Sequence, residues 1–120
     1  MASILVAHQD PHRTDIELIL EGAGHEVVGV DDGLQAIAAV GRAPVHLVVT
    51  AITLPEESGL AVITRLRSLY EGLSFIAIAD ETEPQCNLNA ARAFGAAQVL
   101  RAPVQPRMLL ACVEDLLGAN

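Results

Sequence analysis

The chain contains 120 residues, of which 52% are hydrophobic, and carries a formal net charge of −8. Its apolar runs reach about six residues, short of the ~18 or more that a membrane span requires, and a chain of this length can bury the core of one domain. The acidic balance, with seven scattered arginines and no lysine, argues against binding to a nucleic-acid backbone. We therefore expect one soluble domain over residues 1–120 that binds neither nucleic acid nor membrane.

The amino-terminal segment and the cysteines indicate the compartment. The segment Met1–Val6 lacks the basic stretch and long apolar region of a secretory signal and is typical of a first strand. Cys86 and Cys112 fit no disulfide framework or metal-ligand pattern, so we expect two inert, reduced thiols. These features favour a cytoplasmic protein.

Short apolar runs alternate with segments of helical spacing. In chain order the expected elements are strand Ser3–Ala7, helix Pro11–Glu21, strand Glu26–Val30, helix Leu34–Val40, strand His46–Thr50, helix Leu60–Leu69, strand Phe75–Ala79, helix Pro84–Phe94, strand Gln98–Leu100 and helix Pro106–Leu117. Asp10 and Asp32 are the expected N-caps of the first two helices. The alternation predicts an α/β fold with a parallel sheet covered on both faces, either an open doubly wound sheet, which is simpler, or a fragment of something larger.

In an open sheet of this kind, ligands and chemistry gather beyond the carboxyl ends of the strands. In this chain those segments begin at His8, Asp31, Ala51, Ala79 and Ala102. Almost none of these side chains is reactive, and the sequence contains neither a glycine-rich phosphate motif nor an apparent nucleophile and base. We therefore expect a protein that is not an enzyme, has no cofactor and works by binding other proteins.

The turn signals follow an order typical of one family. Asp10-Pro11 follows the first strand, Asp32-Gly33 opens the second helix, Leu54-Pro55 precedes Gly59-Leu60, and Ala102-Pro103 follows the fifth strand. Over essentially its whole length the sequence resembles the receiver domain of bacterial response regulators, the CheY-like domain. The resemblance implies a flavodoxin-like sheet of five parallel strands in the order 2-1-3-4-5 with five helices, and a place in two-component (phosphorelay) signal transduction.

The resemblance also implies a phosphoryl-transfer site, and the sequence departs from it at each reactive position. In the family a histidine kinase phosphorylates an aspartate, which binds magnesium together with an acidic pair. The positions of the acidic pair, the acceptor, the switch Ser/Thr and the lysine fall on His8, Gln9, Ala51, Ala79 and Ala102. Residues 33–55 contain no Asp or Glu, so a shift in register does not restore the acceptor. We expect a degenerate receiver that is not phosphorylated and holds no magnesium tightly.

Other polar side chains of these loops offer alternatives. His8, Asp10 and His12 form a candidate metal or ligand cluster, which makes a metal- or ligand-sensing domain the alternative function. Thr50 and Thr53 flank Ala51, but a hydroxyl without a neighbouring base is a weak nucleophile. His25 and His46 fall at the opposite end of the sheet, where we expect solvated turns.

The remaining candidate for function is the surface. The resemblance implies a partner-binding and dimerising face formed by the fourth helix, fifth strand and fifth helix, which here displays Arg92, Gln98, Val99, Arg101 and Arg107. Arginine suits such faces because its planar fork holds carboxylates. The acidic loops at the carboxyl edge offer a second surface, to a basic partner. We expect a pseudo-receiver that binds a signalling protein or its own effector domain, with a homodimer through this face as one form.

Overall fold

The computed structural model describes residues 2–118, which form five strands and five helices in strict alternation. Their bounds are β1 Ser3–Ala7, α1 His12–Gly22, β2 Glu26–Val30, α2 Gly33–Arg42, β3 Leu47–Ala51, α3 Gly59–Leu69, β4 Ser74–Ala79, α4 Gln85–Phe94, β5 Gln98–Arg101 and α5 Pro106–Leu117. All the strands are parallel and lie in one sheet with the order β2-β1-β3-β4-β5. The predicted fold class and strand order are confirmed.

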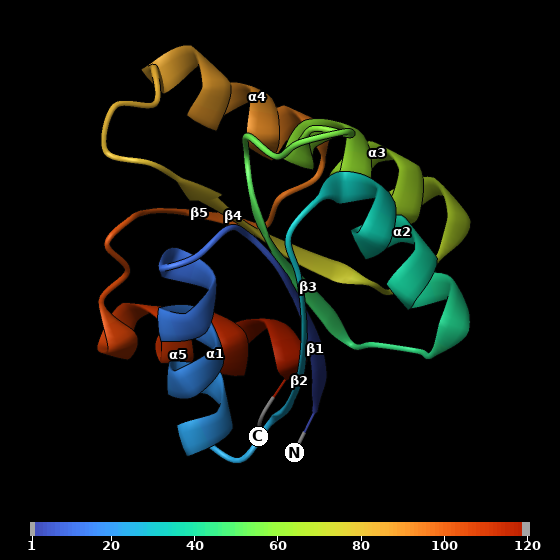
Figure 1. The fold of residues 1–120 in the computed structure, drawn as a ribbon, viewed down its shortest axis with the longest axis vertical. Helices are drawn as coiled ribbons and strands as arrows, with labels where there is room; N and C mark the ends of the chain where they lie inside the picture. Colours follow the sequence, from blue (N-terminus) through green and yellow to red (C-terminus); the bar gives the residue numbers. More distant parts are fainter. Residues whose placement is uncertain (1, 119–120) are drawn as a thin grey trace.

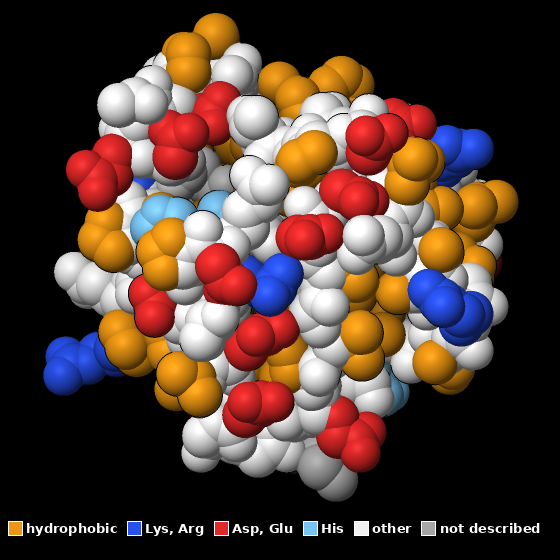
Figure 2. Space-filling view, in the orientation of Figure 1, with side chains coloured by type: hydrophobic (Ala, Val, Ile, Leu, Met, Phe, Trp, Pro, Cys, Tyr) orange, Lys and Arg blue, Asp and Glu red, His pale blue; other side chains and the backbone are white. Residues whose placement is uncertain are grey.

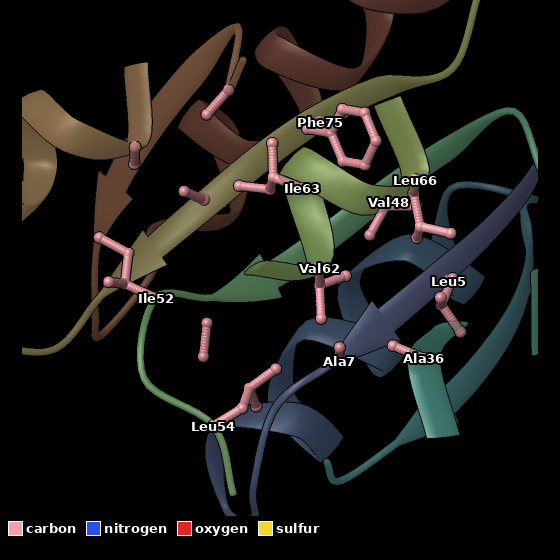
Figure 3. Packing of buried hydrophobic residues seen from close by; sticks show 14 of the residues in the cluster. Leu5, Ala7, Ala36, Val48, Ile52, Leu54, Val62, Ile63, Leu66 and Phe75 are labelled. Atoms are coloured by element: carbon pink, nitrogen blue, oxygen red, sulfur yellow. The ribbon is translucent and has the colours of Figure 1, made fainter. Parts of the chain in front are cut away.

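Two helical layers cover the sheet: α1 and α5 lie on one face, and α2, α3 and α4 lie on the other (Figure 1). Successive strand residues point to opposite faces, so each central strand supplies side chains to two separate cores. Leu5, Val48 and Phe75 pack with α2, α3 and α4, as Figure 3 shows, whereas their neighbours pack with α1 and α5. This burial on both faces explains why β1, β3 and β4 are continuous apolar runs in the sequence.

The expected element boundaries are correct to within one or two residues. The third strand was expected at His46–Thr50 but is Leu47–Ala51, because strand pairing begins with Leu47 opposite Ile4 and Ala51 still pairs with Ile78 of β4. Within residues 2–118, no helix combines the length and apolar character needed to cross a bilayer.

The expected helix caps are partly right. Asp32 caps α2 by accepting the Gln35 amide at 2.8 Å, as predicted. The assignment of Asp10 as the N-cap of α1 is wrong, because Pro11 occupies that position and the helix begins at His12. The Asp10 carboxylate nevertheless accepts the Thr14 amide at 3.1 Å, so it binds a free N–H group of the first helical turn.

Two glycines allow backbone segments to meet beside the end of β3. A Cβ on Gly59 would lie 1.7 Å from the carbonyl oxygen of Ala51, and one on Gly33 would lie 2.0 Å from that of Glu57. A side chain at either position therefore requires the backbone to move. These contacts hold the loop between β3 and α3 closely against the sheet edge.

Candidate functional site at the carboxyl edge of the sheet

The parallel register brings the five positions of the predicted degenerate site to one edge of the sheet. His8 and Gln9 follow β1, Ala51 and Ala79 end β3 and β4, and Ala102 follows β5. The three alanines are 3%, 0% and 3% exposed, respectively. The centre of the edge thus consists of buried methyl groups, without a nucleophile or a charge on these three side chains.

His8 is held in one orientation at this edge. Its backbone amide donates to the Val30 carbonyl at 3.1 Å, and its Nδ1 accepts the Gln9 amide at 2.8 Å. Burial, reinforced by the neighbouring His12, lowers the pKa of His8 from 6.5 to about 4. His8 is therefore a neutral imidazole near pH 7 and supplies no positive charge to the site.

The two carboxylates nearest this edge already have donors. Asp10 accepts from the hydroxyl and amide of Thr14 and from Arg13 at 3.0 Å, and the Thr14 hydroxyl is the main reason for its lowered pKa. Asp80 accepts the hydroxyl and amide of Thr82, which likewise lower its pKa. Both carboxylates stabilise turns in this structure.

The donor set does not fit a metal ion such as magnesium, which prefers several carboxylate, carbonyl and water oxygens in octahedral geometry. Ala51 offers only its backbone, His8 offers nitrogen, and Asp10 is engaged by Thr14 and Arg13. The rings of His8 and His12 lie close, with centroids 5.2 Å apart. However, no group of three or more His, Cys, Asp or Glu side chains suited to a metal occurs among the described residues, so the structure does not favour the metal-sensing alternative.

The threonines beside Ala51 and the histidines at the opposite edge of the sheet have different surroundings. Thr50 is fully buried, and its hydroxyl donates to the Ala51 carbonyl at 3.0 Å, whereas Thr53 is exposed. His25 and His46 lie in the turns before β2 and β3, as expected, with His46 exposed and His25 half-buried, and their Nδ1 atoms accept the amides of Ala2 and Ser3 at 3.2 and 3.0 Å. These two contacts hold the start of β1 beside the turns that precede β2 and β3, at the amino edge of the sheet.

One contact at the candidate site was not expected from the sequence. The Arg101 guanidinium donates to the carbonyl oxygens of Asp80 and Glu81, at 2.9 and 3.4 Å. Glu83, which is buried, accepts the Asn87 side-chain amide at 2.6 Å. The segment between β4 and α4 is therefore held from both β5 and α4. The spacing of these residues gives no helical or strand signal that predicts such a contact.

The predicted partner-binding residues lie along α4, β5 and α5, as expected from their order in the chain. Arg92, Gln98, Arg101 and Arg107 are exposed, and Val99 is half-buried. Sequence reasoning missed Met108, which is 52% exposed and lines a shallow hollow of about 250 Å³ with Val99 and Arg101. This face combines apolar and arginine side chains, a composition common at protein interfaces.

A doubly wound sheet in this order, with its loops at the carboxyl edge, is the architecture of a receiver-type signalling domain. Residues 4–114 match the response regulator receiver domain family, and the chain belongs to that family.

Similar proteins include complete regulators and isolated receiver domains. The sequence is 29% identical to the DNA-binding transcriptional regulator NtrC of Azospirillum brasilense over 99% of this chain and 25% of that protein. The fold superposes on NtrX from Brucella abortus with a TM-score of 0.89 and 25% identity, covering 98% of this chain and 27% of that one. It also superposes on the receiver domain of sensor histidine kinase PA1611 from Pseudomonas aeruginosa PAO1, with a TM-score of 0.87 and 23% identity over 98% of both chains.

The chain spans about a quarter of the length of NtrC and NtrX. The family membership therefore describes a receiver domain of two-component signalling, and the activities of the longer regulators belong to those proteins.

Proposed function

We propose that this chain is a receiver domain that does not accept a phosphoryl group and that acts as a protein-interaction module in signal transduction. The observation that carries the proposal is the side chain of Ala51. It ends the central strand β3 at the position where the family resemblance implies the acceptor aspartate, and it is a buried methyl group.

The chemistry of phosphoryl transfer supports this proposal. An attacking oxygen must lie in line with the phosphorus atom, and cations must offset charge on the phosphoryl oxygens. Ala51 has no such oxygen, Ala102 has no charge, and neutral His8 replaces one of the acids that bind magnesium in the family. The similar domain from PA1611 is described with magnesium in its active-site cleft, whereas the donor set here does not fit that ion.

The interaction role is supported by the surface. Receiver domains in response regulators interact with other proteins and with effector domains, and the arginine-bearing face of α4, β5 and α5 is exposed in this structure. We propose this face as the contact to a signalling partner or to an effector domain, with a homodimer as the alternative arrangement. The proposed domain is not an enzyme.

The first experiment is incubation with acetyl phosphate and magnesium, followed by intact-mass spectrometry at neutral pH. We expect no phosphoryl adduct on the wild-type protein. As a positive control, a variant with His8→Asp, Gln9→Asp, Ala51→Asp, Ala79→Thr and Ala102→Lys restores each family position, and its adduct should be labile to hydroxylamine, as an acyl phosphate is.

The second experiment follows the amide resonances of residues 8–10, 51–53, 79–83 and 101–103 during addition of magnesium and then beryllofluoride. Unchanged spectra of the wild-type protein agree with the proposal. Saturable shifts in these segments, or an acyl phosphate on the wild-type chain, would refute it.

A further inference from the structure

Charge is strongly segregated along the chain and over the molecule. Five of the seven arginines lie in two stretches, residues 58–70 and 84–113, that contain no Asp or Glu. These stretches form α3, α4, β5 and most of α5. On the face shown in Figure 2, acidic side chains are spread widely, and arginine side chains lie at the left and right margins and also near the centre. In a protein of net charge −8, the adjacent helices α3 and α4 thus carry arginines and no carboxylate of their own.

A shallow apolar groove lies on this side, between the outer face of α3 and the end of α4. It has a volume of about 490 Å³ and is lined by Leu60, Ala61, Thr64, Arg65, Ser68 and Phe94. A second hollow of about 370 Å³ shares Thr64, Ser68 and Phe94 and adds Arg67 and Ala93. The stripe from Leu60 to Ser68 runs along α3 for about 12 Å, or roughly two helical turns.

Phe94 is the main apolar side chain of the groove. It is 46% exposed, although phenylalanine is among the residues most often buried. Three of the α3 residues that line the groove with it, Ala61, Thr64 and Ser68, have small side chains, and the Thr64 hydroxyl donates to the Leu60 carbonyl at 2.9 Å. These small side chains leave space for an apolar side chain of a partner to pack beside Phe94.

Two arginines border the groove in defined positions. The Arg67 guanidinium donates to the Phe94 carbonyl at 3.4 Å, and its stem crosses Gly95, where a Cβ would lie 2.7 Å from the Arg67 Cδ. Arg65 pairs with Glu57 at 3.5 Å, and its side chain remains 56% exposed. The Arg67 contact uses only part of the guanidinium, which has five N–H donors. Both cations therefore retain donors for an incoming carboxylate.

We infer that this α3–α4 groove binds an acidic amphipathic helix of a partner protein. The apolar face of such a helix covers Phe94 and Leu60, and its carboxylates meet Arg65 and Arg67, in the helix-in-groove mode of recognition. The spans of α3 and α4 contain no Asp or Glu, and the Glu57 carboxylate, which borders the groove, is paired with Arg65. The groove is separate from the face around β5, and the inference does not depend on whether the domain is phosphorylated.

A nucleic acid fits this groove less well than an acidic helix does, because the floor of the groove is apolar and the whole protein is acidic. A second copy of the chain is the other occupant to test. Leu18 on α1 is 62% exposed, with Asp15 and Glu21 one turn away on either side, so α1 itself is an acidic helix with an exposed leucine. The experiment below separates these outcomes.

The test uses an acetylated, amidated peptide of about four helical turns, with leucine at helical spacing on one face and glutamate elsewhere. It is titrated into the ¹⁵N-labelled protein and, carrying a fluorophore, measured by anisotropy. We expect saturable amide shifts in α3 and at the end of α4. Affinity should fall at least about tenfold for a peptide with lysine in place of glutamate, and for a scrambled peptide of the same composition.

Variants of the protein locate the site. Phe94→Ala and Arg65→Ala should each weaken the glutamate peptide about tenfold or more, with unchanged melting temperature. Leu18→Ala, which removes an apolar side chain of similar exposure from α1, is the matched control and should leave affinity unchanged.

Three results would overturn the inference. The first is absence of saturable shifts in α3 and α4 at millimolar peptide, or shifts confined to β5 and α5. The second is tighter binding of a short DNA duplex than of the glutamate peptide. The third is concentration-dependent dimerisation in sedimentation that Leu18→Ala and Phe94→Ala both abolish, which would assign the groove to a second copy of the chain.

Discussion

At the carboxyl edge of the sheet, the side chains of Ala51, Ala79 and Ala102 are buried methyl groups. The nearby carboxylates of Asp10 and Asp80 accept hydrogen bonds from the amides of Thr14 and Thr82. On the α3–α4 side, by contrast, Phe94 and several arginines face solvent. The first region has the fold of a receiver site with methyl groups at these three positions. The second exposes apolar and arginine side chains, which we propose bind a partner. This contrast is why we propose that the chain acts through the surface of α3, α4, β5 and α5.

The strongest prediction tests how tightly the carboxyl edge is packed. Gly59→Ala should lower the free energy of unfolding by about 3 kcal/mol, because its Cβ would lie 1.7 Å from the Ala51 carbonyl oxygen and force backbone to move. Urea denaturation followed by circular dichroism measures this. Gly22→Ala is the matched control, since a Cβ there meets nothing within 4 Å. Equal stability of the two variants would show that this edge is loosely packed.

The second prediction concerns His8 and pH. Because burial lowers the pKa of His8 to about 4, the unfolded chain, with a pKa near 6.5, binds the proton more readily than the folded protein does. This contribution to stability is complete above about pH 6.5 and is lost as pH falls toward 4. Between pH 7 and 4, the free energy of unfolding of His8→Gln should fall by about 2 kcal/mol less than that of the wild type. This value is smaller than the full pKa shift implies, because His8 is partly exposed.

Chemical denaturation at several pH values measures that difference. His12→Gln is the control, because it removes only the smaller of the two causes that lower the pKa of His8 and should change the slope less. Parallel curves for wild type and His8→Gln would contradict the assignment.

The third prediction concerns the contact between Arg101 of β5 and the segment that follows β4. Arg101→Ala should destabilise the protein by about 1 kcal/mol, because the carbonyl oxygens of Asp80 and Glu81 lose a charged hydrogen-bond donor. Amide exchange of residues 80–83 should become faster. Arg107→Ala, an exposed arginine of α5, should change neither quantity. If both variants behave alike, Arg101 does not hold this segment.

The smallest effect is expected on the binding side. Phe94→Ala should change the free energy of unfolding by no more than about 0.5 kcal/mol, since nearly half of that side chain is exposed. The chain's other phenylalanine, Phe75, is 1% exposed and provides the contrast, because Phe75→Ala leaves a cavity in the core. A large loss of stability on Phe94→Ala would mean that Phe94 serves the fold and not a partner.

The fold could be predicted almost completely from the sequence, because apolar runs buried on both faces of a parallel sheet differ sharply from amphipathic helices. Small boundary errors arose beside β3 and α1. His46 binds the Ser3 amide just before β3, and Pro11 displaces Asp10 from the cap of α1. Such contacts depend on residues far apart in the chain or on local backbone angles, which periodicity does not record.

The sequence by itself determined the parallel α/β architecture, the family resemblance and the alanines at Ala51, Ala79 and Ala102, since residue type and order are enough for each. Only the tertiary structure decided that His8 is a neutral imidazole, that Arg101 holds the segment after β4, and that Phe94 lies against α3 in an apolar groove. The physical reason is that burial, hydrogen-bond partners and surface neighbours arise from segments distant in sequence, which meet only when the sheet and its helices assemble.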